Sequence, residues 1–230
     1  MSRSRDLFEN PAPGVFHSAH LATVISLKDP DNLARVQIRL LNFDGVESHD
    51  GPVWARVAAP FAGKDRGAFW IPDVGDEVLV TFINGDSRLP VVIGGLWNGT
   101  SKSPKTISEG QNRFKVLRSK NGVQITMDDQ EGQEQCIIET PAGQKITLKD
   151  RPAQILIEDA ANNSIKMEAS GITIHGAAKV TVDAPSVEVT AGSVRVATAM
   201  ATFTGHIRCE GLHTNLVESR TYTPGIGNVM

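Results

Sequence analysis

The strongest constraint on this chain is a ladder of paired apolar residues between residues 125 and 209. One residue separates the two apolar members of each pair, and Gly, Pro, Asn, Asp or Ala residues stand between pairs. The first members of successive pairs lie 11, 10, 9, 10, 7, 8, 7, 7, 7 and 6 residues apart. Such a short recurring period indicates a repeat architecture.

Each repeat offers two apolar side chains on one face, because alternate residues of a strand point the same way. Two small side chains cannot offset the ordering of the other residues, which costs roughly 1–2 kcal/mol each, and the sheet edges stay open. Three chains wound about one axis solve both problems, with apolar groups meeting at the centre and each strand hydrogen-bonded to a neighbouring chain. The ladder therefore predicts a trimeric needle.

The predicted axial residues come from the later steps of the ladder. A single-chain β-helix is the alternative, with coils of about 20 or more residues and steps of seven as its three sides. The steps shorten and the apolar groups shrink toward the C-terminus, which predicts a narrowing needle. The axial residues are Ile155, Ile157, Ile165, Met167, Ile172, Ile174, Val180, Val182, Val187, Val189, Val194, Val196, Ile207 and Cys209.

Residues 18–98 contain short alternating segments separated by turns, which are typical of strands with one solvated face. Asn84 to Asp86 form an "NGD" hairpin signal. Five or six strands without a helical period predict a small closed barrel of the OB type. The predicted fold is all-β, an OB-fold barrel followed by an intertwined three-chain β-helix.

The predicted organisation has five parts, because polar, proline-containing stretches flank the two patterned regions. Only 12 residues are aromatic (3 Trp, 1 Tyr and 8 Phe), so the core must depend on Val, Ile and Ala. The parts are an N-terminal arm (1–17), the OB-fold domain (18–98), a linker (99–114), the trimeric β-helix (115–215) and a C-terminal tip segment (216–230).

The net charge of −3 and the absence of a basic stripe argue against nucleic-acid binding. No cofactor or metal motif is visible, and the two cysteines, Cys136 and Cys209, form no CxxC pattern. The sequence shows no apolar signal core and no run of 18 apolar residues. We expect a chain made in the cytoplasm without a signal peptide. Asp73 and Asp76, the candidate paired carboxylates, suit a turn, so we expect no enzyme activity.

Four segments resemble the OB domain of phage baseplate assembly protein V and VgrG-type spikes. They are "LATVISLKDPDNLARVQIRL", "WARVAAPFAG", "IPDVGDEVLVTFINGD" and "PVVIGGLWNG". The later "RSKNGVQITMDD" and "GQKITLKD" are similar to the start of that family's β-helix, and "TYTPGIGN" resembles spike C-termini. The resemblance covers about residues 18–228.

The resemblance implies a homotrimeric spike in the baseplate of a phage tail or phage-like injection particle. It implies a hub protein at the barrel end, a PAAR-type tip protein at the needle end, and a target membrane pierced on sheath contraction. No lysozyme domain separates barrel and needle, and His206 and His213 lie too far apart for a His-x-His iron site. A separate tip protein is therefore favoured, and the parent machine stays open among phage tail, tailocin, extracellular injection system and type VI apparatus.

Several single sites keep two interpretations. The tail segment that breaks the ladder is predicted to cap the needle or dock the tip protein, with a frayed terminus as the alternative. His206 is expected on the surface and Cys209 on the axis, with a threefold metal site or an interchain disulfide as alternatives. Trp54, Trp70 and Trp97 are expected in the core or at the hub interface. The tip residues are Tyr222, Pro224, Gly225, Gly227 and Asn228.

Two other functions compete with the spike. A hydrolase on a β-helical scaffold would require clustered acids in a groove, whereas the outward positions of the ladder mix Lys, Thr, Glu and Arg. A receptor-binding fibre usually ends in a globular head, and about fifteen residues follow the ladder here.

Overall fold

The computed structural model describes residues 18–41 and 51–216 of the chain. Within these residues every regular element is a β-strand apart from one short 3-10 turn, η2 (Ile83–Gly85). The prediction of an all-β fold is confirmed. The predicted N-terminal arm and nearly all of the predicted tip segment lie outside the described residues.

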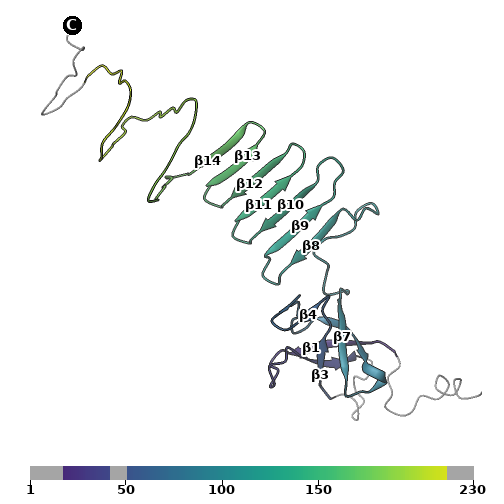
Figure 1. Ribbon diagram of the computed structural model, residues 1–230. Coiled ribbons are helices and arrows are strands. Elements are labelled where there is room, and N and C mark those ends of the chain that lie inside the picture. Colours follow the sequence, from purple (N-terminus) through teal and green to yellow (C-terminus); the bar gives the residue numbers. More distant parts are fainter. Residues whose placement is uncertain (1–17, 42–50, 217–230) are drawn as a thin grey trace, which may run out of the picture. The chain divides into compact units, whose positions relative to one another are not determined.

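Five strands near the N-terminus form a closed barrel, in the order β1-β2-β3-β7-β6 (Figure 1). Neighbouring strands are antiparallel except β3 and β7, which are parallel. A separate two-stranded arm, β4 (Ala62–Gly63) and β5 (Arg66–Gly67), follows β3. The barrel strands are β1 (His20–Ser26), β2 (Val36–Leu40), β3 (Val53–Val57), β6 (Glu77–Phe82) and β7 (Pro90–Leu96).

Aliphatic side chains fill the barrel, as the low aromatic content predicts. Strict alternation along β6 places Val78, Val80 and Phe82 in the interior. Phe82 is the one aromatic residue in this core among the described residues. The remaining core residues are Ala22, Val24, Val36, Ile38, Ala55 and Val92. The OB-type barrel predicted for residues 18–98 is thereby confirmed as a five-stranded closed sheet.

One turn of the barrel differs in detail from its predicted form, and a second is fixed by a carboxylate. Asn84 lies in η2 with φ of +53°, so residues 83–89, rather than a two-residue hairpin, connect β6 and β7. In the turn after β1, the Asp29 carboxylate accepts hydrogen bonds from the backbone N–H groups of Leu33 and Arg35 and from the Arg35 guanidinium. These bonds lower the pKa of Asp29, with the Arg35 side chain as the largest cause.

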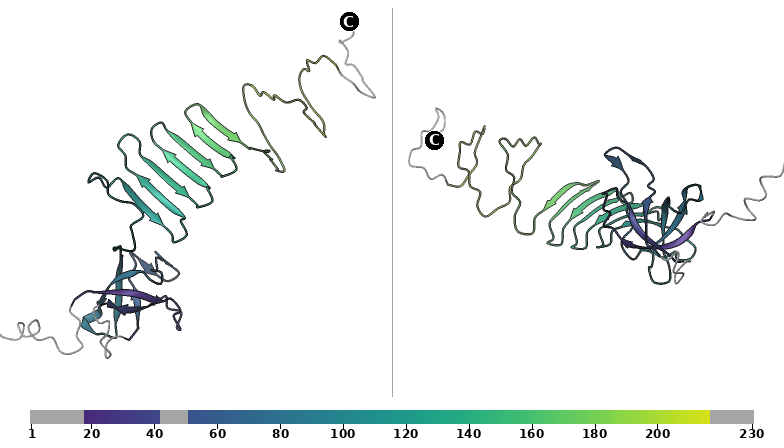
Figure 2. Two further views of the ribbon diagram at one scale, coloured as in Figure 1. Left: turned by 180° about the vertical axis from the view of Figure 1, so that it is seen from behind. Right: turned by 90° about the horizontal axis from the view of Figure 1, so that it is seen from below.

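Seven strands after the barrel form a single antiparallel sheet in which each strand pairs with the next one along the chain (Figures 1 and 2). We call this sheet the meander. Five residue pairs join each two neighbours. The strands are β8 (Phe114–Arg118), β9 (Gln124–Asp128), β10 (Gln135–Glu139), β11 (Lys145–Lys149), β12 (Gln154–Glu158), β13 (Ser164–Glu168) and β14 (Gly171–His175).

The meander corrects the predicted pairing for residues 114–175. We expected each strand to hydrogen-bond to a neighbouring chain, and these strands pair within one chain instead. The physical reason is the repeat length. Steps of 9–11 residues hold a five-residue strand and a turn that reverses the chain, and the seven-residue step from Ile165 to Ile172 also does so, with Ala169 and Ser170 as its turn.

A second unit begins at Thr181, and the structure describes it for residues 181–216. In these residues the chain contains no strand and no backbone–backbone hydrogen bond. All of their side chains are exposed. The segment runs as an open zigzag (green to yellow in Figure 1), although its apolar alternation continues that of the meander. The predicted domain bounds stay predictions.

Candidate functional site

One face of the meander carries two continuous rows of apolar side chains, which we call the apolar face. Register places Ile138 opposite Ile146, and Ile157 opposite Ile165. Residues directly opposite each other in a sheet share a face. The first row is Leu117, Ile125, Ile138, Ile146, Ile157, Ile165 and Ile174, and the second is Met127, Cys136, Leu148, Ile155, Met167 and Ile172.

The apolar face has no covering layer within the chain. Ile157 is 40% exposed and Ile172 is 69% exposed, whereas the valines of the barrel core are at 0–1%. Each isoleucine at this exposure leaves on the order of 70 Å² accessible, so the face totals on the order of 1,000 Å². Contiguous apolar patches on soluble monomers rarely exceed a few hundred Å², so this face is a candidate interface.

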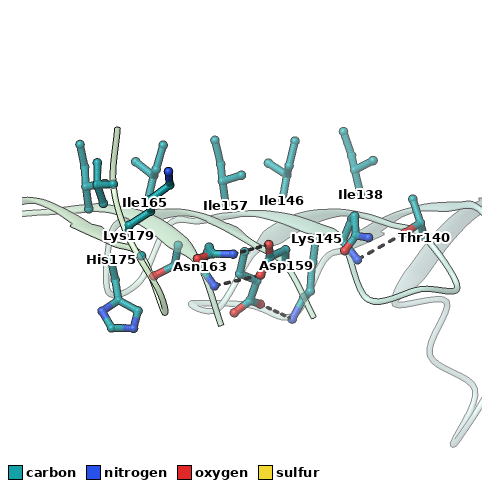
Figure 3. A pocket seen from close by; sticks show the side chains of 16 residues that line it. Ile138, Thr140, Lys145, Ile146, Ile157, Asp159, Asn163, Ile165, His175 and Lys179 are labelled. Atoms are coloured by element: carbon teal, nitrogen blue, oxygen red, sulfur yellow. Dashed lines mark hydrogen bonds and ion pairs between the residues drawn. The ribbon is translucent and has the colours of Figure 1, made fainter. Parts of the chain in front are cut away.

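The opposite face of the meander is polar and hydrogen-bonded. Gln124 donates through Nε2 to Thr126 Oγ1 at 2.8 Å and to Glu139 Oε1 at 2.9 Å. Lys145 and Glu158, which are paired in register, form an ion pair at 3.4 Å. Figure 3 shows four isoleucines of the first row on one side of the sheet and Lys145 on the other; the four are Ile138, Ile146, Ile157 and Ile165. The two faces therefore have opposite chemical character.

A buried ion pair fixes the base of the polar face. The Asp128 carboxylate is 3% exposed, and both of its oxygens accept hydrogen bonds from the Arg113 guanidinium. Gln135, directly opposite Asp128, donates to it at 3.2 Å. These donors, chiefly Arg113, lower the pKa of Asp128 to about 2. The pair ties the segment before β8 to the β9 and β10 strands.

An open groove runs along the meander from Ile138 to Val180, and Glu158 and Asp159 are among its lining residues. Glu158 is paired with Lys145, and the Asp159 carboxylate accepts bonds from the backbone and side chain of Asn163. The Asn163 side chain is the largest cause of the lowered pKa of Asp159. A glycosidase general acid needs a raised pKa, whereas the pKa of Asp159 is shifted in the opposite direction.

The structure brings six of the predicted axial residues onto one face: Ile155, Ile157, Ile165, Met167, Ile172 and Ile174. The predicted axial residues from Val180 to Cys209 lie outside the strands and are exposed. Whether either set meets a common axis stays a prediction. The five predicted tip residues lie outside the described residues.

The structure gives a separate result for each aspartate, tryptophan and histidine that the sequence analysis singled out. Asp76 accepts a hydrogen bond from the backbone N–H of Asp73 at 2.8 Å, which supports the turn interpretation. Trp70 and Trp97 are 64% and 71% exposed, so the core interpretation is wrong for both. Trp54 is half-buried, with the Arg35 guanidinium 5.7 Å from its ring centre. His206 is exposed on the chain, as expected.

Sequence reasoning missed one polar cluster, which we call the exit clasp. Asn163 bonds to Asp159 through both its backbone and side-chain nitrogens, at 2.9 and 2.8 Å. Its Oδ1 accepts a hydrogen bond from the backbone N–H of Ala177 at 2.9 Å, just after β14. The "DAANN" run signals a turn, but no sequence rule links it to residue 177.

No three His, Cys, Asp or Glu side chains gather as a metal site in the described part of the chain. The same part has no helix long and apolar enough to cross a membrane.

Two family models match the chain. Residues 20–97, which span the barrel, match the type VI secretion system/phage-baseplate injector OB domain. Residues 135–195, from β10 into the open zigzag, match the phage baseplate V C-terminal trimerisation domain. Each model therefore coincides with one of the two patterned regions.

Curated relatives include three type VI secretion system spike proteins. VgrG1b of Pseudomonas aeruginosa is 33% identical over 104 residues, covering 42% of this chain and 14% of the relative. VgrG1c of the same species is 29% identical over 159 residues, which cover 64% of this chain and 22% of the relative. VgrG3 of Vibrio cholerae is 31% identical over 115 residues, which cover 47% of this chain and 11% of the relative.

The chain thus spans less than a quarter of the length of each of these relatives. The two family matches together make up more than half of its 230 residues, in the same order as the barrel and the sheet. The chain belongs to the family of VgrG-like baseplate spike proteins.

Proposed function

We propose that this protein is the central spike of a contractile injection machine, a homotrimer whose apolar faces meet on a common axis. The observation that carries the proposal is the uncovered apolar face, thirteen side chains in two rows without a partner in the chain. The match of residues 135–195 to a trimerisation domain supports the proposal that two further copies of this chain cover the apolar face. The axial residues would then be the thirteen of the apolar face together with the eight predicted from Val180 to Cys209.

The energy available from such an association is large. Burying about 70 Å² of apolar surface contributes about 1.8 kcal/mol at roughly 25 cal/mol per Å². Thirteen side chains per copy would contribute on the order of 20 kcal/mol per copy before the costs of association and ordering. If each copy contributes one sheet to a three-sided prism, each sheet needs an apolar inner face and a polar outer face, and the meander has both.

We further propose partners at the two ends of the trimer. A baseplate hub protein would bind at the barrel end. Trp70 and Trp97 are exposed but line a hollow with residues 116–120 of β8 and its turn, so they lie beside the meander and are not assigned to the hub. The C-terminal residues from Tyr222 onward would carry a PAAR-type tip protein. The spike would act mechanically, transmitting the force of sheath contraction to the target membrane in a phage tail or phage-like injection particle, and it would have no catalytic role.

Sedimentation velocity and native mass spectrometry of the full chain test the assembly. We expect one species of three 24.7-kDa copies at micromolar concentration. A single folded copy under these conditions would refute the spike. A zymogram on peptidoglycan tests the mechanical role, because clearing by the purified trimer would establish a hydrolase instead. Co-purification of hub and tip proteins from cells that make the particle tests the partners.

A further inference from the structure

We infer that charged residues on the two lateral edges of the meander pair between neighbouring copies and hold the three copies at one height. The inference rests on the proposed trimer and deepens it, because it assigns contacts between copies to named residues outside the apolar face. Hairpin turns alternate between the two edges of the sheet (Figures 1 and 2). The first edge has the turns 119–123, 140–144 and 159–163, and the second edge has the turns 129–134, 150–153 and 169–170.

The apolar face alone does not specify the height at which two copies meet. Its first row has an isoleucine on every strand from β9 to β14. A copy displaced along the axis by several strand spacings would therefore still place isoleucine against isoleucine. Uniform strand surfaces specify register weakly, and in coiled coils charged residues beside the apolar seam select the partner alignment. The edges of the meander are the corresponding positions in a sheet.

Closed threefold symmetry determines which edges meet. In a ring of identical copies, each copy offers one surface to the next copy and a different surface to the previous one. The first edge of one copy therefore faces the second edge of its neighbour. In the proposed needle the strands stack along the axis, so rotation changes no strand's height. Strands are about 4.8 Å apart, and long side chains can pair across one such spacing.

At the base of the meander, around β8 and β9, the two edges carry opposite charge. On the first edge, Arg118 ends β8 and Lys120 stands in the turn that follows, and both residues are exposed. On the second edge, Glu131 and Glu134 stand in the turn between β9 and β10. Glu131 also lines an open hollow whose lining residues are all polar. A cationic side chain of the next copy would meet carboxylates there.

Halfway along the meander the second edge becomes positive. Lys149 ends β11, and Arg151 stands in the turn between β11 and β12. Asp150 lies between them, so one positive charge is in excess. Neither Lys149 nor Arg151 forms an ion pair or a side-chain hydrogen bond with another described residue. Both cations are therefore available to carboxylates of another copy.

The first edge is negative at this second height. Glu158 ends β12, and Asp159 begins the turn that follows. Lys145 on β11 is paired with Glu158 at 3.4 Å and stands opposite Glu139 on β10, so one lysine accompanies three carboxylates. Level copies thus bring opposite charges together at both heights. Displacement by about three strand spacings in either direction would bring like charges together instead.

Charge reversal in the full-length protein tests the contact at the base. Lys120→Glu should lower the trimer association constant about tenfold to a hundredfold at low ionic strength, because each of three corners loses an attraction and gains a repulsion. Glu131→Lys should act in the same direction. Sedimentation equilibrium measures both constants. Salt at about 1 M should largely remove these differences, because exposed charges are then screened.

The double variant identifies the partner of Lys120. Lys120 Nζ also lies 3.7 Å from an Asp73 oxygen of its own copy, so a single variant does not separate the two contacts. Lys120→Glu combined with Glu131→Lys should recover most of the wild-type association, because the two charges are exchanged. Lys166→Glu is the matched control, since it makes the same charge change in the central row of the polar face. It should leave the association constant within about threefold of the wild-type value.

Cross-linking with a zero-length carbodiimide, which joins a lysine amine to a neighbouring carboxylate, tests proximity. We expect covalent dimers and trimers of the wild-type protein on denaturing gels, with a peptide that links Lys120 to Glu131 or Glu134. Lys120→Arg keeps the charge but has no amine at this position. It should remain a trimer and lose the linked peptide.

The outcomes separate the inference from the proposed function. The inference is overturned if the wild-type protein is a trimer and its association is unchanged by both single variants, or if the linked peptide is missing. Failure of the double variant to recover association would overturn it as well. Each of these results leaves the spike intact, whereas a wild-type protein that sediments as one copy would refute the proposed function itself.

Discussion

Two adjacent residues of β12 give opposite predictions for a single copy and for a trimer. Leu156 lies on the polar face and is half-buried, whereas Ile157 lies on the apolar face and is 40% exposed. If one copy were the functional unit, Leu156→Asp would cost more stability than Ile157→Asp. If three apolar faces meet on an axis, the order reverses, because Ile157 becomes fully buried.

The size of the effect follows from burial. Each Ile157 would bury about 70 Å² on association, worth about 1.8 kcal/mol, so three copies lose about 5 kcal/mol when the side chain is replaced. At 1.4 kcal/mol for each factor of ten, the association constant falls by about four orders of magnitude. Three unpaired carboxylates near the axis add a further desolvation penalty of several kcal/mol each unless they take up protons.

Sedimentation velocity at micromolar concentration measures the difference in association between the two variants. We expect Ile157→Asp to sediment as a single copy and Leu156→Asp to remain a trimer with lowered thermal stability. Circular dichroism at 25 °C controls for folding, since both variants should retain β-sheet signal. A trimeric Ile157→Asp protein beside a dissociated Leu156→Asp protein would refute the assignment of the apolar face to the axis.

Three further predictions concern the stability of the chain. Asp128→Asn should lower the unfolding free energy by about 1–3 kcal/mol in urea titrations, because Arg113 loses its charged acceptor. The lowered pKa of Asp128 contributes stability above its ordinary value of 3.8, so part of the wild-type stability should disappear between about pH 4 and pH 2, and in Asp128→Asn it should not. Asp29→Ala should lower the melting temperature of the barrel in thermal melts, because two backbone donors and Arg35 lose their acceptor. Urea unfolding and refolding curves of the trimer should not superimpose, since unwinding three chains is slow.

The sequence predicted which side chains share a face because the strand period is two. The pairs Ile155/Ile157 and Ile165/Met167 stand on one side of the sheet as their alternation requires. The closed barrel followed from alternating segments of strand length between turns. In both regions the two-residue period of a strand was enough to predict which side chains share a face.

The partner of each strand could not be predicted, because alternation is the same whether a strand pairs within its chain or with another copy. Step length does not decide the partner, because the seven-residue step from Ile165 to Ile172 forms an in-chain hairpin between β13 and β14, as the longer steps before it do. The exit clasp could not be read either, since its bond joins Asn163 to the backbone of Ala177, fourteen residues away.

Dependence on other copies increases along this chain. The barrel buries its own core, with Val78 and Val80 at 0% exposure. The meander pairs its own backbone but leaves Ile157 40% exposed, and the segment beyond it satisfies neither side chains nor backbone in one copy. Folding must therefore begin where a single copy is self-sufficient, because an isolated segment cannot offset its ordering entropy. If the apolar faces hold three copies together, as proposed, residues 181–216 of the three copies would be kept at a high effective concentration relative to one another.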